Sequence, residues 1–350
     1  GLQVAAYLDG ELVLDAWAGL ADAASGAPVT ADTLFLAYSC SKGVTSTVIH
    51  QLAEAGKLDY DTPVASYWPE FAARGKGAIT LRHILTHQAG IPHLPLNLSL
   101  ETVCDEDAMR ELIAGLTPRW RPGLRTAYHG ITMGPILGEV IARVTGQTFR
   151  EVVAQSIAQP LGLEDFFFGV PPAEASRLAR LCGAPVPWTP LPRFFLVNRV
   201  IPRGVEPGLR WNCAQVHQIP MPAGNLVTSA RSLARHYAAL CPAGADGIHL
   251  LPPERIRQAT ALQTRARDHT MFWMRIPKGL GYWLGGGAVP GLGPRQTVFG
   301  HTGAGGTIGF ADPDQNFSFA LFKNQMSFRG SEDTDVTVMQ AVRRALGLKA

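Results

Sequence analysis

A serine and a lysine stand three positions apart near the start of the chain, in the stretch SCSK at residues 39 to 42. If a helix begins near Ser39, this spacing places its hydroxyl and the amine of Lys42 on one face, about 5 to 6 Å apart. A hydroxyl beside a proton acceptor is what nucleophilic catalysis needs. On spacing alone, an equally good interpretation is that Ser39 caps the helix and Lys42 is a solvated first-turn charge.

Two later segments carry further candidate groups. Tyr128 lies between a Pro-Gly turn and an apolar helical pattern, where a single tyrosine is usually a packing residue. The stretch FGHTGAGGTIGF at 299–310 is rich in glycine, yet it completes neither a dinucleotide-binding fingerprint nor a Walker loop. Its glycines leave the backbone accessible to a ligand, because no side chain obstructs the approach.

Other catalytic patterns fit less well. His83 and His87 are four residues apart, but the glutamate of the H-E-x-x-H zinc motif is missing, so buried structural histidines are favoured. The chain has no G-x-S-x-G motif, which excludes the nucleophile elbow. Cys40 lies one helical step, about 100°, away from the face of Ser39 and is interpreted as a packing residue.

Composition indicates an ordinary globular protein. Of the 350 residues, 46% are hydrophobic and 17% are charged. The net charge of +3 is spread along the chain without a basic block, which argues against nucleic acid or an anionic membrane as the main partner. The oligomeric state is left open.

The five cysteines are odd in number and show no C-x-x-C pair, so neither a disulfide framework nor a thiolate zinc site is expected. No metal or other cofactor is predicted. This cysteine usage favours a reducing compartment and hence the cytoplasm. The chain begins at Gly1, so a removed leader stays an open alternative.

The pattern of elements predicts an α+β fold. The first 18 residues form two strand-like runs joined by Asp9-Gly10, the signal of a tight hairpin. Residues Ser39 to Ala55 are predicted to form one helix. From about 60 to 240 the signals are mainly helical, including LRHILTHQ at 81–88. Strand signals return after about 280, and a helix at 332–348 closes the chain.

Strands at both ends with helices between them predict an antiparallel sheet built from both termini. We therefore expect a discontinuous sheet domain from residues 1–75 and 245–350, and a mostly helical domain from 76–244. A Pro-rich and aromatic stretch at about 183–212, which includes Trp188, is predicted to form a long irregular wall that shapes the pocket. Ordinary packing of a long loop is an equally good interpretation.

Together, S-x-x-K, Tyr and x-T-G in this order are the signature of serine β-lactamases and penicillin-binding proteins. The chain resembles this superfamily, and within it the class C β-lactamase-like proteins and family VIII carboxylesterases. The resemblance spans nearly the whole chain, and its residues are SCSK at 39–42, LTHQAGIP at 85–92, PGLRTAYHG at 122–130, GEVIARVTGQ at 138–147 and GHTGAGGTIGF at 300–310. It implies the β-lactamase/transpeptidase-like fold, with a sheet flanked by helices and a mostly helical domain.

The resemblance also implies acyl transfer through a covalent ester, with a small-molecule ester or amide as the substrate. Ser39 would attack the carbonyl, Lys42 and Tyr128 would share the proton transfers, and the backbone N–H groups of Ser39 and Ala304 would form the oxyanion hole. Either base must lower its pKa by about 3 units, because free lysine and tyrosine titrate near 10. The sequence leaves open which of the two is the acylation base.

Two departures from the family pattern bear on the substrate. The lysine of K-T-G is His301 here, and the residue two after the tyrosine, often Asn, is Gly130. His301, Thr302 and Gly303 are still expected to border the substrate. Without the hydrogen bond from this lysine, recognition of a substrate carboxylate weakens by roughly 10- to 100-fold. Binding of a neutral ester is not affected by this change.

We therefore predict a serine carboxylesterase that acts on small or medium acyl esters. The alternatives are a β-lactamase or D-amino-acid peptidase, and an acyltransferase of specialised metabolism. A catalytically silent binding protein is disfavoured because all three proton-handling residues are present.

Overall fold

An antiparallel sheet built from both ends of the chain organises the molecule. The structure is a computed structural model that describes residues 1–183, 199–289, 291–326 and 334–349. The strand order is β2-β1-β12-β11-β10-β9, so the first two strands pair with the last ones, as the sequence predicted. The strands are β1 Leu2–Leu8, β2 Glu11–Ala18, β9 Trp283–Leu284, β10 Phe299–Gly303, β11 Thr307–Asp312 and β12 Phe317–Lys323.

The predicted hairpin between β1 and β2 is present. Asp9 and Gly10 both have positive φ, at 52° and 87°, as a tight primed turn requires. Along β1 the side chains alternate between two cores: Ala5 and Tyr7 pack on one face of the sheet, and Val4 and Ala6 on the other. Both faces of the sheet are therefore covered.

Smaller strand groups lie beside this sheet. The strands β5, β8 and β6 form an antiparallel sheet in that order, β3 pairs with β4, and β7 pairs in parallel with β13. Their bounds are β3 Leu20–Asp22, β4 Ala27–Pro28, β5 Phe35–Leu36, β6 Phe166–Phe168, β7 Cys182–Gly183, β8 Leu226–Thr228 and β13 Gln325–Met326.

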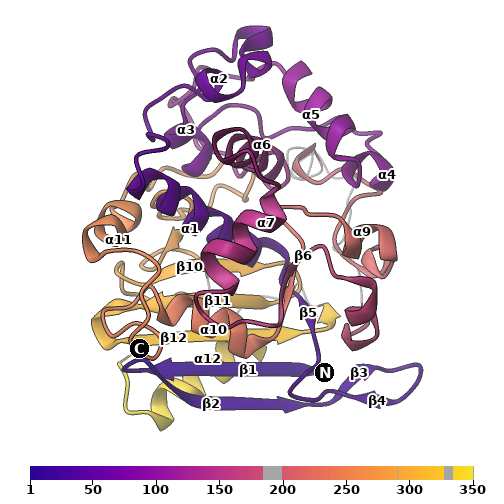
Figure 1. Ribbon diagram of the computed structural model, residues 1–350, viewed down its shortest axis with the longest axis vertical. Coiled ribbons are helices and arrows are strands. Elements are labelled where there is room, and N and C mark those ends of the chain that lie inside the picture. Colours follow the sequence, from indigo (N-terminus) through magenta and orange to yellow (C-terminus); the bar gives the residue numbers. More distant parts are fainter. Residues whose placement is uncertain (184–198, 290, 327–333, 350) are drawn as a thin grey trace.

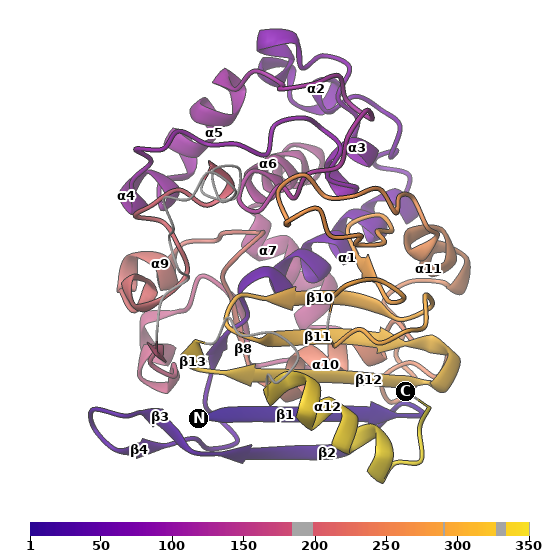
Figure 2. The same ribbon diagram turned by 180° about the vertical axis from the view of Figure 1, so that it is seen from behind.

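Helices cover both faces of the main sheet, with α1 and α10 on one face and α12 on the other (Figures 1 and 2). Most of the remaining helices, including α2 to α6, lie on the side of α1 that faces away from the main sheet (Figure 1). Their bounds are α1 Ser41–Glu54, α2 Val64–Tyr67, α3 Leu81–Leu85, α4 Leu100–Val103, α5 Glu106–Gly115, α6 Met133–Thr145, α7 Phe149–Val153, α9 Ala214–Gln218, α10 Ala230–Ala238, α11 Pro253–Thr260 and α12 Thr334–Ala345.

Short 3-10 turns connect several of these elements. They are η1 Tyr38–Cys40, η2 Pro69–Gly75, η4 Pro172–Arg177, η6 Leu209–Trp211 and η7 Pro313–Gln315. A π-helical turn, η3 Ala154–Ala158, continues α7.

The predicted single helix from Ser39 to Ala55 is wrong at its start. Ser39 lies in η1, and α1 begins only at Ser41. Ser39 is held instead in a 3-10 turn, in which the backbone N–H of Cys40 donates to the carbonyl of Ala37 at 3.1 Å. The turn begins at Tyr38, whose φ of 48° is left-handed. The hydroxyl of Ser41 donates to the carbonyl of Tyr38 and accepts from the backbone N–H of Leu226, so the turn is fixed from two sides.

The helix predicted over 81–88 is also shorter than expected. Helix α3 begins after Thr80, whose hydroxyl forms a capping box with His83, and it ends at Leu85. His87 follows with a φ of 58°, outside the helix, so the two histidines do not share a helical face.

The predicted fold class is confirmed, with an antiparallel sheet, flanking helices and a mostly helical region between them. The proposed division into a discontinuous sheet domain and a helical domain stays a prediction. Among the described residues, no helix combines the length and the apolar character needed to cross a membrane.

The close contact of α1 with α10 gives a first testable prediction. A side chain at Gly43 would collide with the hydroxyl of Tyr237, which is buried and has no hydrogen-bond partner among the described residues. Gly43→Ala should therefore lower the free energy of unfolding by about 1–3 kcal/mol in urea titrations. Tyr237→Phe alone should cost little, because the hydroxyl it removes is unpaired.

The double variant distinguishes this contact from a general effect of alanine. In the Tyr237→Phe background, Gly43→Ala should lose most of its destabilising effect. An equal loss in both backgrounds would show that the collision is not the cause.

Candidate active site

Ser39 lies at the junction between β5 and α1, at the wall of a large cavity. The left-handed residue before it, Tyr38, turns the chain sharply, so the half-buried Ser39 projects from a tight 3-10 turn. Strained backbone of this kind is common where a catalytic side chain must be presented to a substrate. The cavity has a volume of about 840 Å³, and Ser39 is part of its lining.

The amine of Lys42 contacts three oxygen atoms. Its Nζ lies 3.1 Å from the Oγ of Ser39 and donates to the carbonyls of Gly130 and Ala223, both at 2.8 Å. A neutral amine has two N–H donors and one lone pair. With both N–H groups directed at carbonyls, the lone pair is left for the hydroxyl proton of Ser39.

Burial sets the charge state of this amine. The side chain of Lys42 is completely buried, and desolvation lowers its pKa to about 7. Around neutral pH a large fraction of Lys42 is therefore uncharged and able to accept a proton. The pKa of Lys42 is therefore lowered by about the 3 units that a lysine base needs.

Tyr128 reaches Ser39 from the opposite side. Its hydroxyl donates to the Oγ of Ser39 at 2.8 Å, and its ring lies 5.0 Å from the Nζ of Lys42. Burial raises the pKa of Tyr128, although the hydrogen bond to Ser39 opposes this shift. The phenol is consequently protonated at neutral pH and acts as a donor, while Lys42 is the available acceptor.

A buried ion pair holds the backbone of Tyr128. The carboxylate of Asp268 accepts from the backbone N–H of Tyr128 at 3.0 Å and from the ammonium of Lys278 at 3.0 Å. Both side chains are essentially inaccessible. Burial alone would raise the pKa of Asp268, but the charge of Lys278 and hydrogen bonds from Thr270 and Lys278 lower it, so the carboxylate is ionised.

Two buried histidines complete this support. His129 accepts at Nε2 from the backbone N–H of Ile91, so its Nδ1 carries the proton donated to the carbonyl of Ala127. His87 accepts at Nδ1 from the backbone N–H of His129 and packs edge-on against Tyr128, with ring centroids 5.0 Å apart. Burial lowers the pKa of both histidines, so they are neutral packing residues, as predicted for His87.

Ala304 follows β10 and lines the same cavity as Ser39. The strand approaches the turn around Ser39 closely at Gly303, where an added Cβ would lie 2.6 Å from the carbonyl oxygen of Ala37 and 3.1 Å from the Cβ of Tyr38. Only glycine permits this approach. The predicted oxyanion pair, the backbones of Ser39 and Ala304, therefore borders one cavity.

His301 is buried on β10 rather than exposed to the cavity. Its ring stacks on Trp283 at 4.2 Å, and its Nδ1 lies 2.6 Å from the carbonyl of Thr302. Burial lowers its pKa to about 3, with a smaller effect of Lys42, so the ring is uncharged. Within the described part of the chain, His301, Thr302 and Gly303 are not part of the cavity lining. Their role in substrate binding stays a prediction.

Cys40 is a buried residue behind the site, in agreement with the sequence. Its thiol donates to the carbonyl of His301 at 3.2 Å, and burial raises its pKa to about 12. The thiolate, which is the reactive form of cysteine, is therefore scarce at neutral pH.

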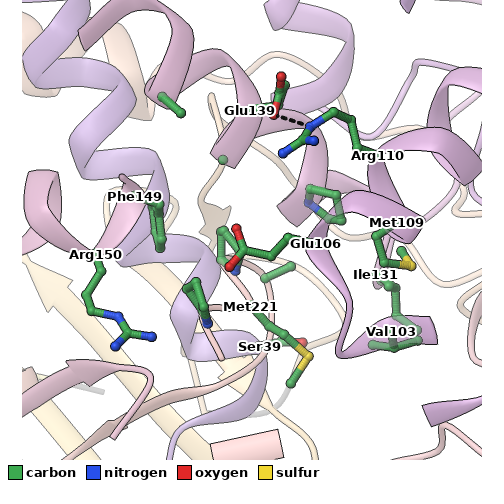
Figure 3. A pocket seen from close by; sticks show the side chains of 18 of the residues that line it. Ser39, Val103, Glu106, Met109, Arg110, Ile131, Glu139, Phe149, Arg150 and Met221 are labelled. Atoms are coloured by element: carbon green, nitrogen blue, oxygen red, sulfur yellow. Dashed lines mark hydrogen bonds and ion pairs between the residues drawn. The ribbon is translucent and has the colours of Figure 1, made fainter. Parts of the chain in front are cut away.

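The cavity continues away from Ser39 between helices α4 to α7 (Figure 3). The lining is mainly apolar and includes Val103, Met109, Ile131, Trp211 and Met221. Charged side chains also line it: Arg110 and Arg143 both pair with Glu139, and Glu106 lies beside Met221 in Figure 3. The cavity thus offers a mainly apolar surface to a substrate.

Trp188, predicted to line the pocket, lies outside the described residues, as does half of the stretch 183–212. Trp211, from the same stretch, packs against Tyr38 with ring centroids 5.4 Å apart. Sequence reasoning missed the Asp268–Lys278 pair and the carbonyls of Gly130 and Ala223. Backbone acceptors have no residue signature, and the ion pair is formed by an unremarkable Asp and Lys ten positions apart. Among the described residues, no cluster of three or more His, Cys, Asp or Glu could hold a metal ion.

Comparison with known proteins places this site in a family. The β-lactamase family model matches residues 1–343. The chain is 34% identical over 346 residues to the esterase/beta-lactamase LipL of Mycobacterium tuberculosis, which covers 93% of this chain and 77% of that protein.

Solved structures agree with this match. A family VIII carboxylesterase superposes with a TM-score of 0.88 at 30% identity, over 98% of this chain and 92% of the other. A penicillin-binding protein homologue from Caulobacter crescentus gives a TM-score of 0.85 at 31% identity, over 97% and 90%. The chain therefore belongs to the β-lactamase family and has the fold that its sequence motifs predicted.

Proposed function

We propose that the chain is a serine hydrolase that cleaves carboxylic esters through an acyl-enzyme on Ser39. One observation carries this proposal: the Oγ of Ser39 lies within hydrogen-bond distance of both Lys42 and Tyr128 at the wall of a large cavity. The names of two similar proteins, an esterase/beta-lactamase and a family VIII carboxylesterase, support the same reaction class.

In the acylation step, the neutral amine of Lys42 takes the proton of Ser39 while Oγ attacks the ester carbonyl. The negative charge on the carbonyl oxygen is stabilised by the backbone N–H groups of Ser39 and Ala304. The bond to the alcohol then breaks, and the alcohol oxygen takes a proton from the Tyr128 hydroxyl. The ammonium of Lys42 then gives its proton to the Tyr128 phenolate, so both groups regain their starting charge.

In the second step, water attacks the acyl-enzyme at the same carbonyl. Lys42, neutral again, accepts a proton from this water, and the proton passes to the departing Oγ of Ser39. The acid product and the free serine result. One amine thus serves as base in both halves of the reaction, and its pKa near 7 suits both directions of transfer.

The state of His301 favours esters over β-lactams. Where the antibiotic-binding members have a lysine to attract the substrate carboxylate, this chain has an uncharged and buried ring. The cavity lining is mainly apolar as well. An uncharged acyl ester needs no cationic partner at position 301, whereas a carboxylate there would lack the one that the family's lysine provides.

The expected partner is therefore a small uncharged ester.

A cytoplasmic location is also proposed. This location is supported by the five cysteines, none of which forms a disulfide.

The identity of the nucleophile can be tested by covalent labelling. Ser39→Ala should lower kcat/KM for p-nitrophenyl butyrate by about 1,000-fold or more, because the covalent intermediate can no longer form. A fluorophosphonate should add to Ser39 in the wild type, as located by mass spectrometry of its peptides. Cys40→Ala is the matched control and should keep both labelling and most of the activity. Labelling at Cys40, or an active Ser39→Ala variant, would contradict the mechanism.

The pH dependence tests the role of Lys42. Protonated Lys42 cannot accept the proton of Ser39, so kcat/KM should fall tenfold per unit below the pKa and level off above it. The inflection is expected near pH 7, as burial lowers the pKa of Lys42 to about 7. Lys42→Arg, which stays cationic, should be nearly inactive at every pH tested. A rate that keeps rising to pH 10 would show that Lys42 titrates like a free lysine.

Substrate preference tests the apolar cavity. With p-nitrophenyl esters, kcat/KM should rise from acetate to hexanoate by up to about 4-fold per added CH₂. Val103→Phe, which narrows the cavity, should reduce the hexanoate rate more than the acetate rate. A chromogenic cephalosporin should be cleaved at least about 10- to 100-fold less efficiently than the butyrate ester. A cephalosporin rate equal to the ester rate would favour a β-lactamase instead.

A further inference from the structure

Two surface segments that are far apart in the sequence lie side by side next to the support of Tyr128. One precedes Tyr128, at 118–126, and the other, at 264–276, contains Asp268. The backbone N–H of His269 donates to the carbonyl of Thr126 at 3.1 Å. The His269 ring also contacts Trp120 at 6.2 Å and Trp273 at 4.2 Å, so aromatic rings connect the two segments.

Large apolar side chains are exposed along this junction. Leu124 is 65% exposed, Phe272 51% and Trp273 50%. Phe272 and Trp273 are consecutive and both have a left-handed backbone, with φ of 51° and 60°. Bulky residues rarely adopt this conformation, and two in a row are costly to hold. The fold nevertheless keeps both aromatic side chains at the surface instead of burying them.

The charges of the same surface are all positive. Arg121, Arg125, Arg267 and Arg275 are exposed, and none of them forms an ion pair within the described residues. The two segments contain one acidic residue, Asp268, and its side chain is buried and paired with Lys278. We call the surface formed by these arginines with Leu124, Phe272 and Trp273 the arginine–aromatic face.

We propose that the arginine–aromatic face docks the protein onto an anionic lipid surface. Such a surface presents phosphate groups, which guanidinium groups bind well, directly above an apolar layer. Aromatic and leucine side chains that stand beside cations insert at this boundary, as in interfacial protein segments. A nucleic acid would pair with the arginines but would offer no apolar layer for Leu124, so the lipid surface fits the face better.

This proposal concerns contact with a lipid surface and does not require a segment that spans it. It is independent of the esterase proposal, because it uses neither Ser39 nor the cavity. The sequence argued against an anionic membrane because its positive charge is spread along the chain. The fold, however, brings arginines from two segments about 140 positions apart onto one face, and pairs the acidic residue between them internally.

Vesicle sedimentation tests the proposal with the full chain. Wild-type protein should sediment with phosphatidylcholine vesicles that contain roughly one third phosphatidylglycerol, and not with pure phosphatidylcholine. Binding should fall strongly when salt is raised to roughly 1 M, because screening removes the attraction of the arginines. The double variant Arg121→Gln/Arg125→Gln should bind about 30-fold more weakly, because each lost arginine weakens binding about fivefold.

The aromatic part of the face has its own variant. Trp273→Asn should also weaken binding, and asparagine tolerates the left-handed backbone at this position. Two matched controls lie elsewhere on the surface: Arg257→Gln on α11 and Leu96→Asn, a residue that is 49% exposed. Both should bind vesicles like the wild type. Unfolding midpoints of all variants show whether each one is folded.

Three results would overturn the proposal. The first is no binding to the anionic vesicles at low salt. The second is an equal loss of binding in the folded control variants and the folded face variants. The third is binding to a DNA duplex without binding to the vesicles, which would assign the face to nucleic acid.

Discussion

The site depends on burying the amine of Lys42 among three oxygen atoms. These oxygens come from separate parts of the chain: Ser39 from the turn before α1, Gly130 from the segment before α6, and Ala223 from the segment before β8. An amine without such partners would not be buried, because an unpaired buried polar group is costly. The amine of Lys42 therefore has all of its hydrogen-bond partners only when the three segments have packed around α1.

The burial of α1 makes this possible. The helix lies between the main sheet and the helical region, and nearly all of its side chains are buried. Several of its polar residues have internal partners: Thr47 contacts His236 at 3.0 Å and Tyr282 at 2.7 Å, and His50 contacts Tyr60 at 2.7 Å. Buried polar networks of this kind specify one arrangement of a core. The same desolvation that makes the network costly lowers the pKa of Lys42 into the range a base needs.

The sequence was most informative where chemistry is tied to a residue type at a fixed spacing. Ser39 and Lys42 could be predicted because three positions on a helical turn bring their side chains together, and the hairpin at Asp9 because few residues favour that turn. The left-handed backbone at Tyr38 and His87 could not be predicted, since tertiary contacts impose it against the preference of both residues. Carbonyl partners and the pairing of Asp268 depend on which segments meet in space. The distribution of charge on the surface also depends on which segments meet in space. Arginines that are dispersed in the sequence can therefore lie side by side in the fold.

The replacement of a lysine by His301 also changes the charge balance at Ser39. A lysine at this position would add a second ammonium group near Lys42, and like charges lower the pKa of a neighbouring amine. In this chain His301 is uncharged, and desolvation is what lowers the pKa of Lys42. When Lys42 takes the proton of Ser39, the new ammonium group therefore forms beside a neutral ring. Its two carbonyl acceptors stabilise it, and Tyr128 keeps its proton for the leaving alcohol. The proton taken from Ser39 can then replace the one that Tyr128 gives to the alcohol.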